Sequence, residues 1–550
     1  MKKQTLVKLM STAMVSSLVL TACGGGSTAQ PSTDKPADQG ATEENKAPQV
    51  LRLNINSEPP TLDPGLAEDS TSGTLIRQMF EGLTRIGEDE NPHEAAAEKI
   101  EVSEDLKTYT FTIRENAKWS NGDPVTAYDF EYAWERVLAP ETAANYAYQL
   151  YVIKNAEKFN KGEIKDVNEV GIKATDERTL VVELENPTPY FLELTAFYTY
   201  MPVNKNIVEA NKDWANDATD KYVSNGAFKL DKWEHNNIAE IVKNDQYWDA
   251  DKVQLDRITF AMIEDHATAF NMFENGELDW AGAPTSDLPT DAIPTLKDQG
   301  RLNIYPIAGT YWYKFQTEKP PFNNVKMRKA FAYAMDRQTI IDNVTQADQI
   351  PAMGAVPPTM GLKNEGYFKD NDLETAKKLF DEGLQELGMT KEELDVTLSY
   401  NTSESHQKIA QAIQDQWKKA FGIDVKLENM EWKVYLEEMH SGNYQVGRMG
   451  WLGDFNDPIN FLELYKDKYG GNNDTLWENA DFQRLLGESA VEADPDKRKQ
   501  ILAQAEQILM DEMPIAPIYF YTKSYVKDDK VKGVLLHGLG DVDYKYAYIE

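Results

Sequence analysis

Residues 447–462, GRMGWLGDFNDPINFL, form the most informative stretch of the chain. They place a cation (Arg448), a large aromatic side chain (Trp451) and two carboxylates (Asp454 and Asp457) among glycines, which do not continue a helix and allow close approach of another chain. An acid and an arginine on such a segment suit the two charged ends of a small zwitterion. Taken alone, the stretch favours a surface turn with solvated charges, so its interpretation depends on the rest of the chain.

Length and charge limit the classes of protein that this chain can represent. Its 550 residues exceed one hydrophobic core, so about two to four domains are expected. The formal net charge of −34 repels phosphate backbones, which excludes nucleic acid as a partner. The 11 Trp, 27 Tyr and 20 Phe indicate a globular protein, and Tyr and Trp often line binding sites.

The N-terminus has the pattern of a bacterial lipoprotein signal. Lysines at the start precede a mostly apolar run at residues 9–22, which is too short to span a membrane. The run ends in LTAC, residues 20–23, which resembles a lipobox with cleavage before Cys23 and diacylglycerol on its thiol. Cys23 is the only cysteine, so a disulfide is not expected. Residues 1–22 are therefore predicted to be a signal peptide.

The segment after Cys23 predicts a tether. Residues 24–49 are rich in Gly, Ser, Thr, Pro and acidic residues and lack apolar periodicity. Residues 23–49 are thus expected to hold the folded body at the outer face of the cell membrane through lipid on Cys23, as is typical of a Gram-positive envelope.

From residue 50 onward, patterns of strands and helices alternate, which indicates an α/β architecture. Strands are expected at residues 50–55, 108–114, 179–184, 257–262, 396–400, 423–427 and 514–521. Helices are expected at residues 72–83, after a Thr126 cap, and at 267–274, 406–421, 431–440 and 497–510.

Common catalytic and metal-binding motifs are absent from the sequence. It contains no GxxxxGK[ST], GxSxG or HExxH, and its six histidines are scattered. The segment DFNDP at residues 454–458 lacks the glycine and distal glutamate of a calcium loop. We therefore expect no cofactor, no metal and no enzymatic activity, although a hydrolase with paired carboxylates stays as an alternative.

Short motifs recur along the chain in an order that resembles a known family. They are LDP (62–64), FEGL (80–83), WSNGDPVTAYDFEYAW (119–134), NGAF (225–228), GTYWY (309–313), KPPFNNVKMRKAFAYAMDR (319–337), ENMEW (428–432), GWLGDFNDP (450–458) and APIYFY (516–521). From about residue 50 to 550, the chain resembles the oligopeptide-binding proteins of bacterial peptide ABC importers. The same solute-binding family also contains dipeptide- and nickel-binding members.

The resemblance implies a two-lobed, periplasmic-binding-protein-like α/β fold (class II, cluster C) with three domains and a hinge. The expected domains are I (50–85, 203–307 and 518–550), II (86–202) and III (308–517). It also implies a monomeric extracytoplasmic lipoprotein that captures short oligopeptides and delivers them to the permease subunits of an ABC transporter.

The resemblance further implies a binding site in the cleft. Asp454 is expected to take the free ammonium of the peptide, while Arg448 balances charge and pairs with the cleft acid Glu68. His406 is expected to help bind the carboxyl end. The remaining cleft residues implied are aromatic: Trp451, Trp432, Tyr146 and Tyr521.

One departure leaves the far end of the ligand open. Met439 stands where enterobacterial members have an arginine that helps to read the C-terminus of the peptide. Peptide length and the need for a free carboxylate therefore stay undecided at this point. Alternatives of the same fold are binders of a nickel chelate, an oligosaccharide or one signalling peptide, and an acid for a free ammonium at position 454 favours peptides over chelates. Alternatives of other classes are an anchored hydrolase and a lipoprotein chaperone or adhesin.

Overall fold

The computed structural model describes residues 48–360, 362, 366–492 and 494–550. The expected signal peptide, Cys23 and nearly all of the tether lie outside these residues. Residues 48–550 form one compact unit of mixed α/β structure, as the alternating sequence patterns predict. Within the described ranges, no helix has the length and apolar character that crossing a membrane requires.

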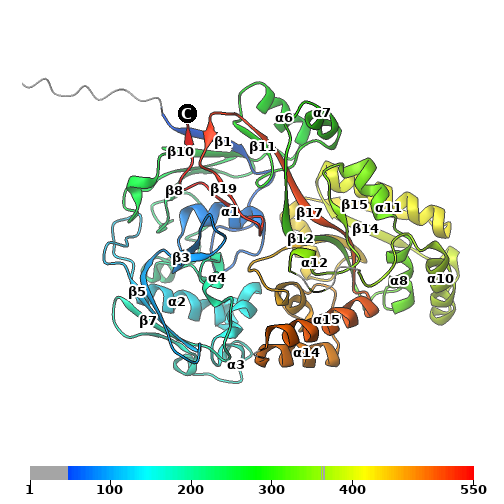
Figure 1. Ribbon diagram of the computed structural model, residues 1–550, viewed down its shortest axis with the longest axis horizontal. Coiled ribbons are helices and arrows are strands. Elements are labelled where there is room, and N and C mark those ends of the chain that lie inside the picture. The colour runs from blue at the N-terminus through cyan, green and yellow to red at the C-terminus, as the bar shows by residue number, and fades with distance from the viewer. Residues whose placement is uncertain (1–47, 361, 363–365, 493) are drawn as a thin grey trace, which may run out of the picture. The chain divides into compact units, whose positions relative to one another are not determined.

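A four-stranded sheet joins the start of this unit to a segment about two hundred residues later (Figure 1). Its order is β1 (Val50–Asn54), β10 (Arg257–Ala261), β9 (Ile238–Lys243) and β8 (Phe228–Glu234). β1 pairs parallel with β10, and the other pairs are antiparallel. Leu51 and Leu53 are fully buried, which confirms the alternating strand predicted at residues 50–55.

Two of the sequence motifs, FEGL and NGAF, bind each other beside this sheet. Helix α1 (Ser70–Met79) ends before FEGL, so the helix expected to reach residue 83 is shorter than predicted. The Asn225 side chain accepts a hydrogen bond from Glu81 N and donates one to Glu81 O, both at 3.0 Å. Gly226 N donates to Met79 O at 2.7 Å. Helix α1 ends at Met79 because the main-chain groups of Met79 and Glu81 form hydrogen bonds with the loop at residues 225–226.

A second four-stranded sheet is entirely antiparallel and comes from one continuous part of the chain. Its order is β4 (Ala97–Val102), β5 (Thr108–Ile113), β7 (Thr179–Glu183) and β6 (Ile172–Ala174). Helix α2 (Ala127–Leu138) packs on it and begins with the predicted Thr126 cap, which forms a capping box with Asp129. Shorter elements of this part of the chain are β2 (Thr84–Ile86), β3 (Pro92–Glu94), α3 (Ala156–Asn160), α4 (Phe191–Leu194) and α5 (Lys205–Ala210).

The third sheet is formed mainly by the later part of the chain, and two long strands, β12 and β17, lie next to each other within it. Its order is β11 (Trp280–Gly282), β17 (Ile515–Lys527), β12 (Asn303–Phe315), β16 (Val446–Leu452), β14 (Val396–Asn401) and β15 (Val425–Met430), and β13 (Ile350–Pro351) also pairs with β17. Figure 1 shows β12 and β17 side by side between the β11 region and the helices α8 and α15. The expected domain borders at 307/308 and 517/518 fall inside these two strands.

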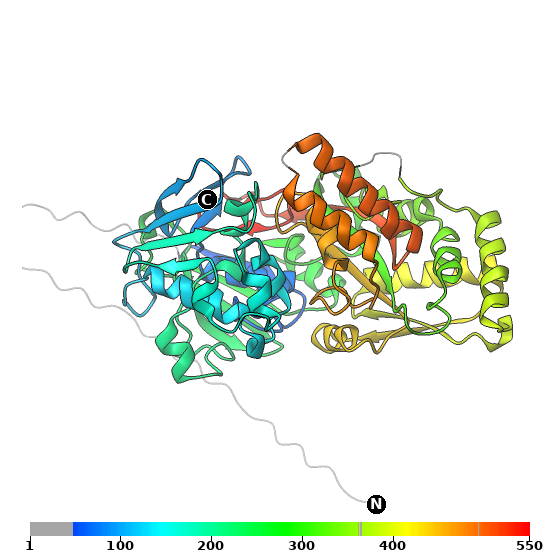
Figure 2. The ribbon, with the colours of Figure 1, turned by 90° about the horizontal axis from the view of Figure 1, so that it is seen from below.

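The remaining helices come from residues 266–512, the same part of the chain as most strands of this sheet. They are α6 (His266–Glu274), α7 (Ile293–Asp298), α8 (Val325–Tyr333), α9 (Arg337–Ile340), α10 (Leu373–Leu387), α11 (Glu404–Phe421), α12 (Trp432–His440), α13 (Ile459–Leu462), α14 (Ala480–Val491) and α15 (Pro495–Glu512). Figure 2 shows α14 and α15 packed side by side. In α11, Ile409, Ile413 and Trp417 are fully buried, as their spacing of four predicts.

The turn favoured by residues 447–462 alone is wrong for the first part of that stretch, which forms strand β16. Its glycines serve close packing. A Cβ on Gly447 would lie 2.4 Å from Met439 Sδ, and one on Gly450 would lie 2.5 Å from the Tyr521 hydroxyl. The glycines therefore let the backbone of β16 lie close to two large side chains, Met439 of α12 and Tyr521 of β17.

We expect Gly226→Ala to lower the free energy of unfolding by about 1–3 kcal/mol, as overpacking typically does. A Cβ at this position would lie 2.5 Å from Met79 C and 2.7 Å from Phe80 N, and backbone cannot move aside as a flexible side chain can. Urea denaturation measures the change. Gly487→Ala in α14 is the control, because open space surrounds its Cβ and helix propensity predicts a gain of up to about 1 kcal/mol. Equal stability of the two variants would contradict the packing argument.

Candidate ligand-binding site

A cavity of about 320 Å³ lies where the loop before α1, the short helix Asn145–Val152, the loop at residues 283–290 and the strands β16 and β17 meet. Its volume is in the range of small-ligand sites. All eight side chains implied by the family resemblance line it: Glu68, Tyr146, His406, Trp432, Arg448, Trp451, Asp454 and Tyr521. The fold brings them together from distant positions, while their role in binding a ligand stays a prediction.

Neutral donors hold the carboxylate of Asp454, which follows the end of β16. Gln149 Nε2 donates to Asp454 Oδ2 at 2.6 Å, and the Tyr146 hydroxyl lies 3.3 Å from the same oxygen. Asn460 Nδ2 donates to Asp454 Oδ2 at 3.4 Å, and Asn460 Oδ1 accepts from Asp454 N at 3.0 Å. Within the described residues, no lysine, arginine or histidine forms an ion pair with this carboxylate. Asp454 is thus hydrogen-bonded but has no counter-ion.

Burial raises the pKa of Asp454 to about 7, against the opposing effects of the Asn460 hydrogen bond and the Arg77 charge. Arg77 itself pairs with Asp541 at 2.8 Å, so its charge is already largely balanced. Burial likewise raises the pKa of nearby Glu463 to about 8, and the charge of Asp454 contributes. An entering cation would stabilise the ionised form of Asp454.

Arg448 lies on β16 and is also without a carboxylate partner among the described residues. Its Nη2 donates to the Tyr521 hydroxyl at 3.1 Å, and its Nη1 donates to Asn401 Oδ1 at 3.3 Å. The guanidinium lies 4.7 Å from the ring centroid of Tyr311. The expected ion pair with Glu68 is wrong, because Glu68 binds other groups.

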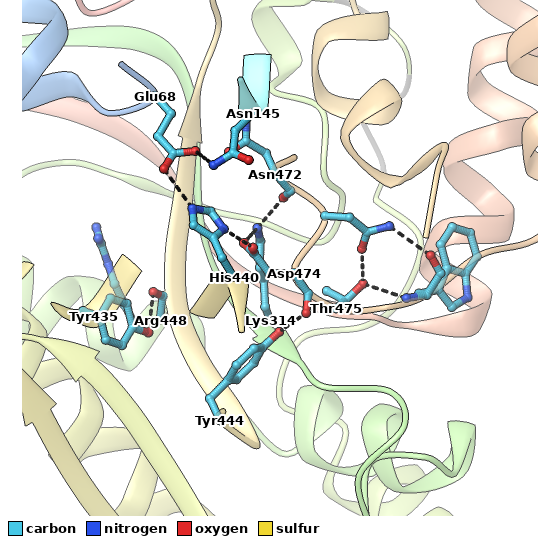
Figure 3. A network of polar contacts seen from close by, with 12 residues as sticks. Glu68, Asn145, Lys314, Tyr435, His440, Tyr444, Arg448, Asn472, Asp474 and Thr475 are labelled. Carbon is cyan, nitrogen blue, oxygen red and sulfur yellow. Dashed lines mark hydrogen bonds and ion pairs between the residues drawn. The ribbon is translucent and has the colours of Figure 1, made fainter. Parts of the chain in front are cut away.

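Glu68 belongs to a charged network that the sequence did not reveal (Figure 3). One carboxylate oxygen accepts from His440 Nε2 at 2.9 Å, and the other accepts from Asn145 Nδ2 at 2.7 Å. His440 Nδ1 lies 2.7 Å from Asp474 Oδ1. Burial alone would lower the pKa of His440, but the hydrogen bonds and charges of Asp474 and Glu68 raise it to about 10. The imidazolium form satisfies both carboxylates at once.

The same network continues to a buried lysine. Lys314 Nζ donates to Asp474 Oδ2 and, at 2.7 Å, to the main-chain oxygen of Asn472. Lys314 and His440 hold the pKa of the Asp474 carboxyl well below its ordinary value despite burial. The network ties the loop before α1 to the end of α12 and to the loop at residues 472–475 (Figure 3). No sequence motif connects these positions, so they could be found only in the structure.

The predicted aromatic residues form cavity walls and also bind their surroundings. Trp451 Nε1 donates to Asn460 Oδ1 at 2.9 Å, and its ring lies 6.0 Å from that of Tyr146. Trp432 Nε1 lies 3.4 Å from Asp69 Oδ1, so it spans from α12 to the cap of α1. These contacts fix the two tryptophan rings in place on the cavity wall.

His406 lies in the first turn of α11 and lines the cavity as a neutral imidazole. Burial, followed by the charges of Arg448, His266 and Lys523, lowers its pKa well below the ordinary value. Its Nδ1 lies 3.3 Å from the Tyr311 hydroxyl. It can offer a ligand a hydrogen bond but no positive charge at neutral pH.

Met439, by contrast, does not line the cavity. It is fully buried in a small cluster with Tyr435 and Tyr444, and it presses against Gly447 of β16. Its apolar side chain therefore packs the back of the strand. Any contact with the far end of a ligand must come from another residue.

Strand β16 presents a free edge to the cavity. It pairs with β12 along its whole length but with β14 only at Val446 and Gly447. Residues 449–453, beyond that pairing, line the cavity. Main-chain groups on an unpaired edge can bind an extended chain as an added strand.

Comparison with known proteins gives matches over nearly the whole chain. The model of the bacterial extracellular solute-binding proteins, family 5, matches residues 91–473. The oligopeptide-binding protein OppA of Bacillus subtilis is 55% identical over 554 residues that include all of both chains. The structure of Haemophilus influenzae OppA in complex with RPPGFSPFR is 32% identical and has a TM-score of 0.86, covering 91% of this chain and 99% of that chain.

An open structure is less similar. The periplasmic murein tripeptide-binding protein MppA in its unliganded open form has a TM-score of 0.60 at 33% identity, covering 91% of this chain and 97% of that chain. The several α/β sheets of residues 48–550 are thus arranged as in solved peptide-binding proteins, and more nearly as in the peptide complex than as in the open form.

We expect His440→Gln to lower the free energy of unfolding by about 1–3 kcal/mol at pH 7, because two carboxylates lose a charged donor. A raised histidine pKa stabilises the fold fully below its ordinary value of about 6.5, and this stabilisation is lost as pH rises through about 10. Urea denaturation at pH 7 and pH 10 should show the deficit shrinking at the higher pH. The exposed His93, which bonds Asp89, provides His93→Gln as the control, with little change at either pH. A deficit that is the same at both pH values would argue against the charged bridge.

Proposed function

Because the chain belongs to the bacterial extracellular solute-binding proteins, family 5, we propose that it captures short oligopeptides outside the cytoplasm and delivers them to an ABC importer. Proteins of this family are solute-binding, non-catalytic components of transport. The observation that carries the proposal is Asp454, a carboxylate on the cavity wall that has hydrogen bonds but no ion-pair partner among the described residues. The ammonium of a free peptide N-terminus is the group that completes it.

The geometry suits a ligand defined by its backbone and its ends. The free edge of β16 offers main-chain groups to an extended peptide whatever its side chains are. Around that edge, Trp432, Trp451, Tyr146 and Tyr521 provide amphipathic walls. Main-chain pairing gives affinity without selecting a sequence, and the ammonium at Asp454 sets the register of the peptide.

The remaining residues are assigned roles within this proposal. Arg448 supplies positive charge at the other end of the cavity and His406 a neutral hydrogen bond. Glu68 acts through His440, by which it joins the loop before α1 to α12 and holds the cavity wall together. Among these residues, Arg448, Trp451 and Tyr521 come from strands of the large sheet, and the others come from the loops and helices around it.

The proposal extends to domains and anchoring. The first sheet is built from residues expected in domain I and the second from residues expected in domain II. β12 and β17, which contain the expected borders with domain III, then form the hinge. The lipobox-like sequence at residues 20–23 supports attachment of a monomer to the membrane through lipid on Cys23, where it can meet its permease.

We expect Asp454→Asn to weaken binding of a free tripeptide by about 30-fold or more, since loss of a desolvated ion pair costs about 2–5 kcal/mol. Calorimetry with trialanine and N-acetyl-trialanine measures this change. Acetylation should weaken binding strongly in the wild type and little in Asp454→Asn. The reason is that acetylation of the peptide and the substitution in the protein remove the same ion pair. Asp89→Asn at the exposed surface is the control. Unchanged affinity of Asp454→Asn for trialanine would refute the assignment.

Peptide affinity should fall as the pH drops below about 7. The pKa of Asp454 is raised to about 7 in the empty protein, and a bound ammonium lowers it, so binding requires loss of a proton at lower pH. The affinity for trialanine is then greatest near pH 7 and falls by up to about tenfold per pH unit below it, while above about pH 8 it falls again because the free peptide amine loses its proton. Titrations at pH 5, 6, 7 and 8 measure it, and Asp454→Asn should flatten the profile. A wild-type profile as flat as that of the variant would contradict the role of Asp454.

A further inference from the structure

A second cation lies unpaired on the wall of the cavity, close to Arg448. Lys523 is on β17, two residues beyond Tyr521 and therefore on the same face of the sheet. Its Nζ lies 5.6 Å from the ring centroid of Tyr521, and the hydroxyl of the same ring accepts the hydrogen bond from Arg448. Tyr521 thus lies between two positive charges.

Neither cation has an ion-pair partner in the part of the chain that the structure describes. Burial, and then the charge of Arg448, lowers the pKa of Lys523, while the charge of Asp287 opposes this effect. Asp287, the acid whose charge acts on Lys523, also lines the cavity, and its carboxylate lies 4.0 Å from His266 Nε2. Two partly buried like charges that lie close together destabilise a protein unless an anion offsets them.

Arg448 and Asp454 lie at different ends of the free edge of β16, and Lys523 of β17 is close to the Arg448 end, across the ring of Tyr521. Arg448 precedes Asp454 by six residues, of which five, 448–452, are in β16. At about 3.3 Å per residue, their backbones are at most about 20 Å apart. An extended peptide of about six residues has that length. A shorter peptide can still contact both Asp454 and Arg448 because their side chains extend from the backbone toward it.

Resting on the proposed function, we propose that Lys523 is a specificity-determining residue that receives the C-terminal carboxylate of the peptide beside Arg448. It supplies the charge that Met439 cannot, because Met439 is packed behind β16 and away from the cavity. The cavity is then electrically matched to a zwitterionic peptide of up to about six residues, with an anion for the ammonium and two cations for the carboxylate. His406 contributes a hydrogen bond without charge.

The test compares tetra-alanine with its C-terminal amide and its N-acetyl derivative on the wild type, Lys523→Met, Lys523→Arg and Lys527→Met. Methionine keeps the length of the side chain without its charge. Lys527 lies on the same strand, binds Val531 O at 2.9 Å and does not line the cavity, so it is the matched control. Thermal unfolding of each variant shows whether the fold is retained.

Amidation should weaken binding to the wild type about tenfold or more. Lys523→Met should bind the free peptide about tenfold more weakly and discriminate acid from amide less than threefold, while keeping its loss on N-acetylation. Lys523→Arg should restore discrimination. If Lys523→Met still discriminates acid from amide as the wild type does, the inference is overturned.

Two further outcomes separate this inference from the proposed function. If the wild type loses affinity on N-acetylation but not on amidation, the carboxylate role of Lys523 fails and the peptide-binding function stands. If the wild type binds none of the three peptides, both fail. A folded Lys523→Met that binds the free acid and the amide equally, both at the wild-type affinity for the amide, supports the inference.

Discussion

The structure of the binding site depends on charges that the protein leaves without partners. Asp454 accepts hydrogen bonds from Gln149 and Asn460, yet burial raises its pKa to about 7, and none of the described lysines, arginines and histidines forms an ion pair with it. Arg448 is a cation without a carboxylate partner among the described residues, and it contacts Tyr311, the Tyr521 hydroxyl and the Asn401 side-chain amide. A buried charge that is hydrogen-bonded but unbalanced is costly in the empty protein. The same arrangement makes a zwitterionic ligand favourable, because each end of the ligand offsets one of these charges.

The network around His440 shows the opposite arrangement a short distance away. Glu68, His440, Asp474 and Lys314 alternate in charge, and each hydrogen-bonding group of the His440 ring faces a carboxylate. This balanced set joins the loop before α1 to α12 and stabilises the closed wall of the cavity. The protein thus separates two tasks: balanced charges hold the parts together, and unbalanced charges face the ligand.

Local sequence predicted much of the fold because the deciding interactions are local. The alternation at residues 50–55 and the face of Ile409, Ile413 and Trp417 follow directly from burial on one side of a strand or helix. Helix α1 ended earlier than expected because Asn225 and Gly226, more than a hundred residues later, bind the main chain of FEGL. The glycines of β16 predict a turn when they are read alone, because the sequence does not show that Met439 and Tyr521 lie against them.

The sequence by itself determined the class of the protein: a long acidic chain with a lipoprotein-type start, alternating strands and helices, and short motifs in the order of one known family. Only the tertiary structure decided which charges are paired. In the structure, Glu68 binds His440 instead of Arg448, and Lys523 lies beside the ring of Tyr521. Met439 is buried against β16. The physical reason is that side-chain identity and local periodicity can be read along the chain. The partner of a charge depends instead on distances between segments hundreds of residues apart.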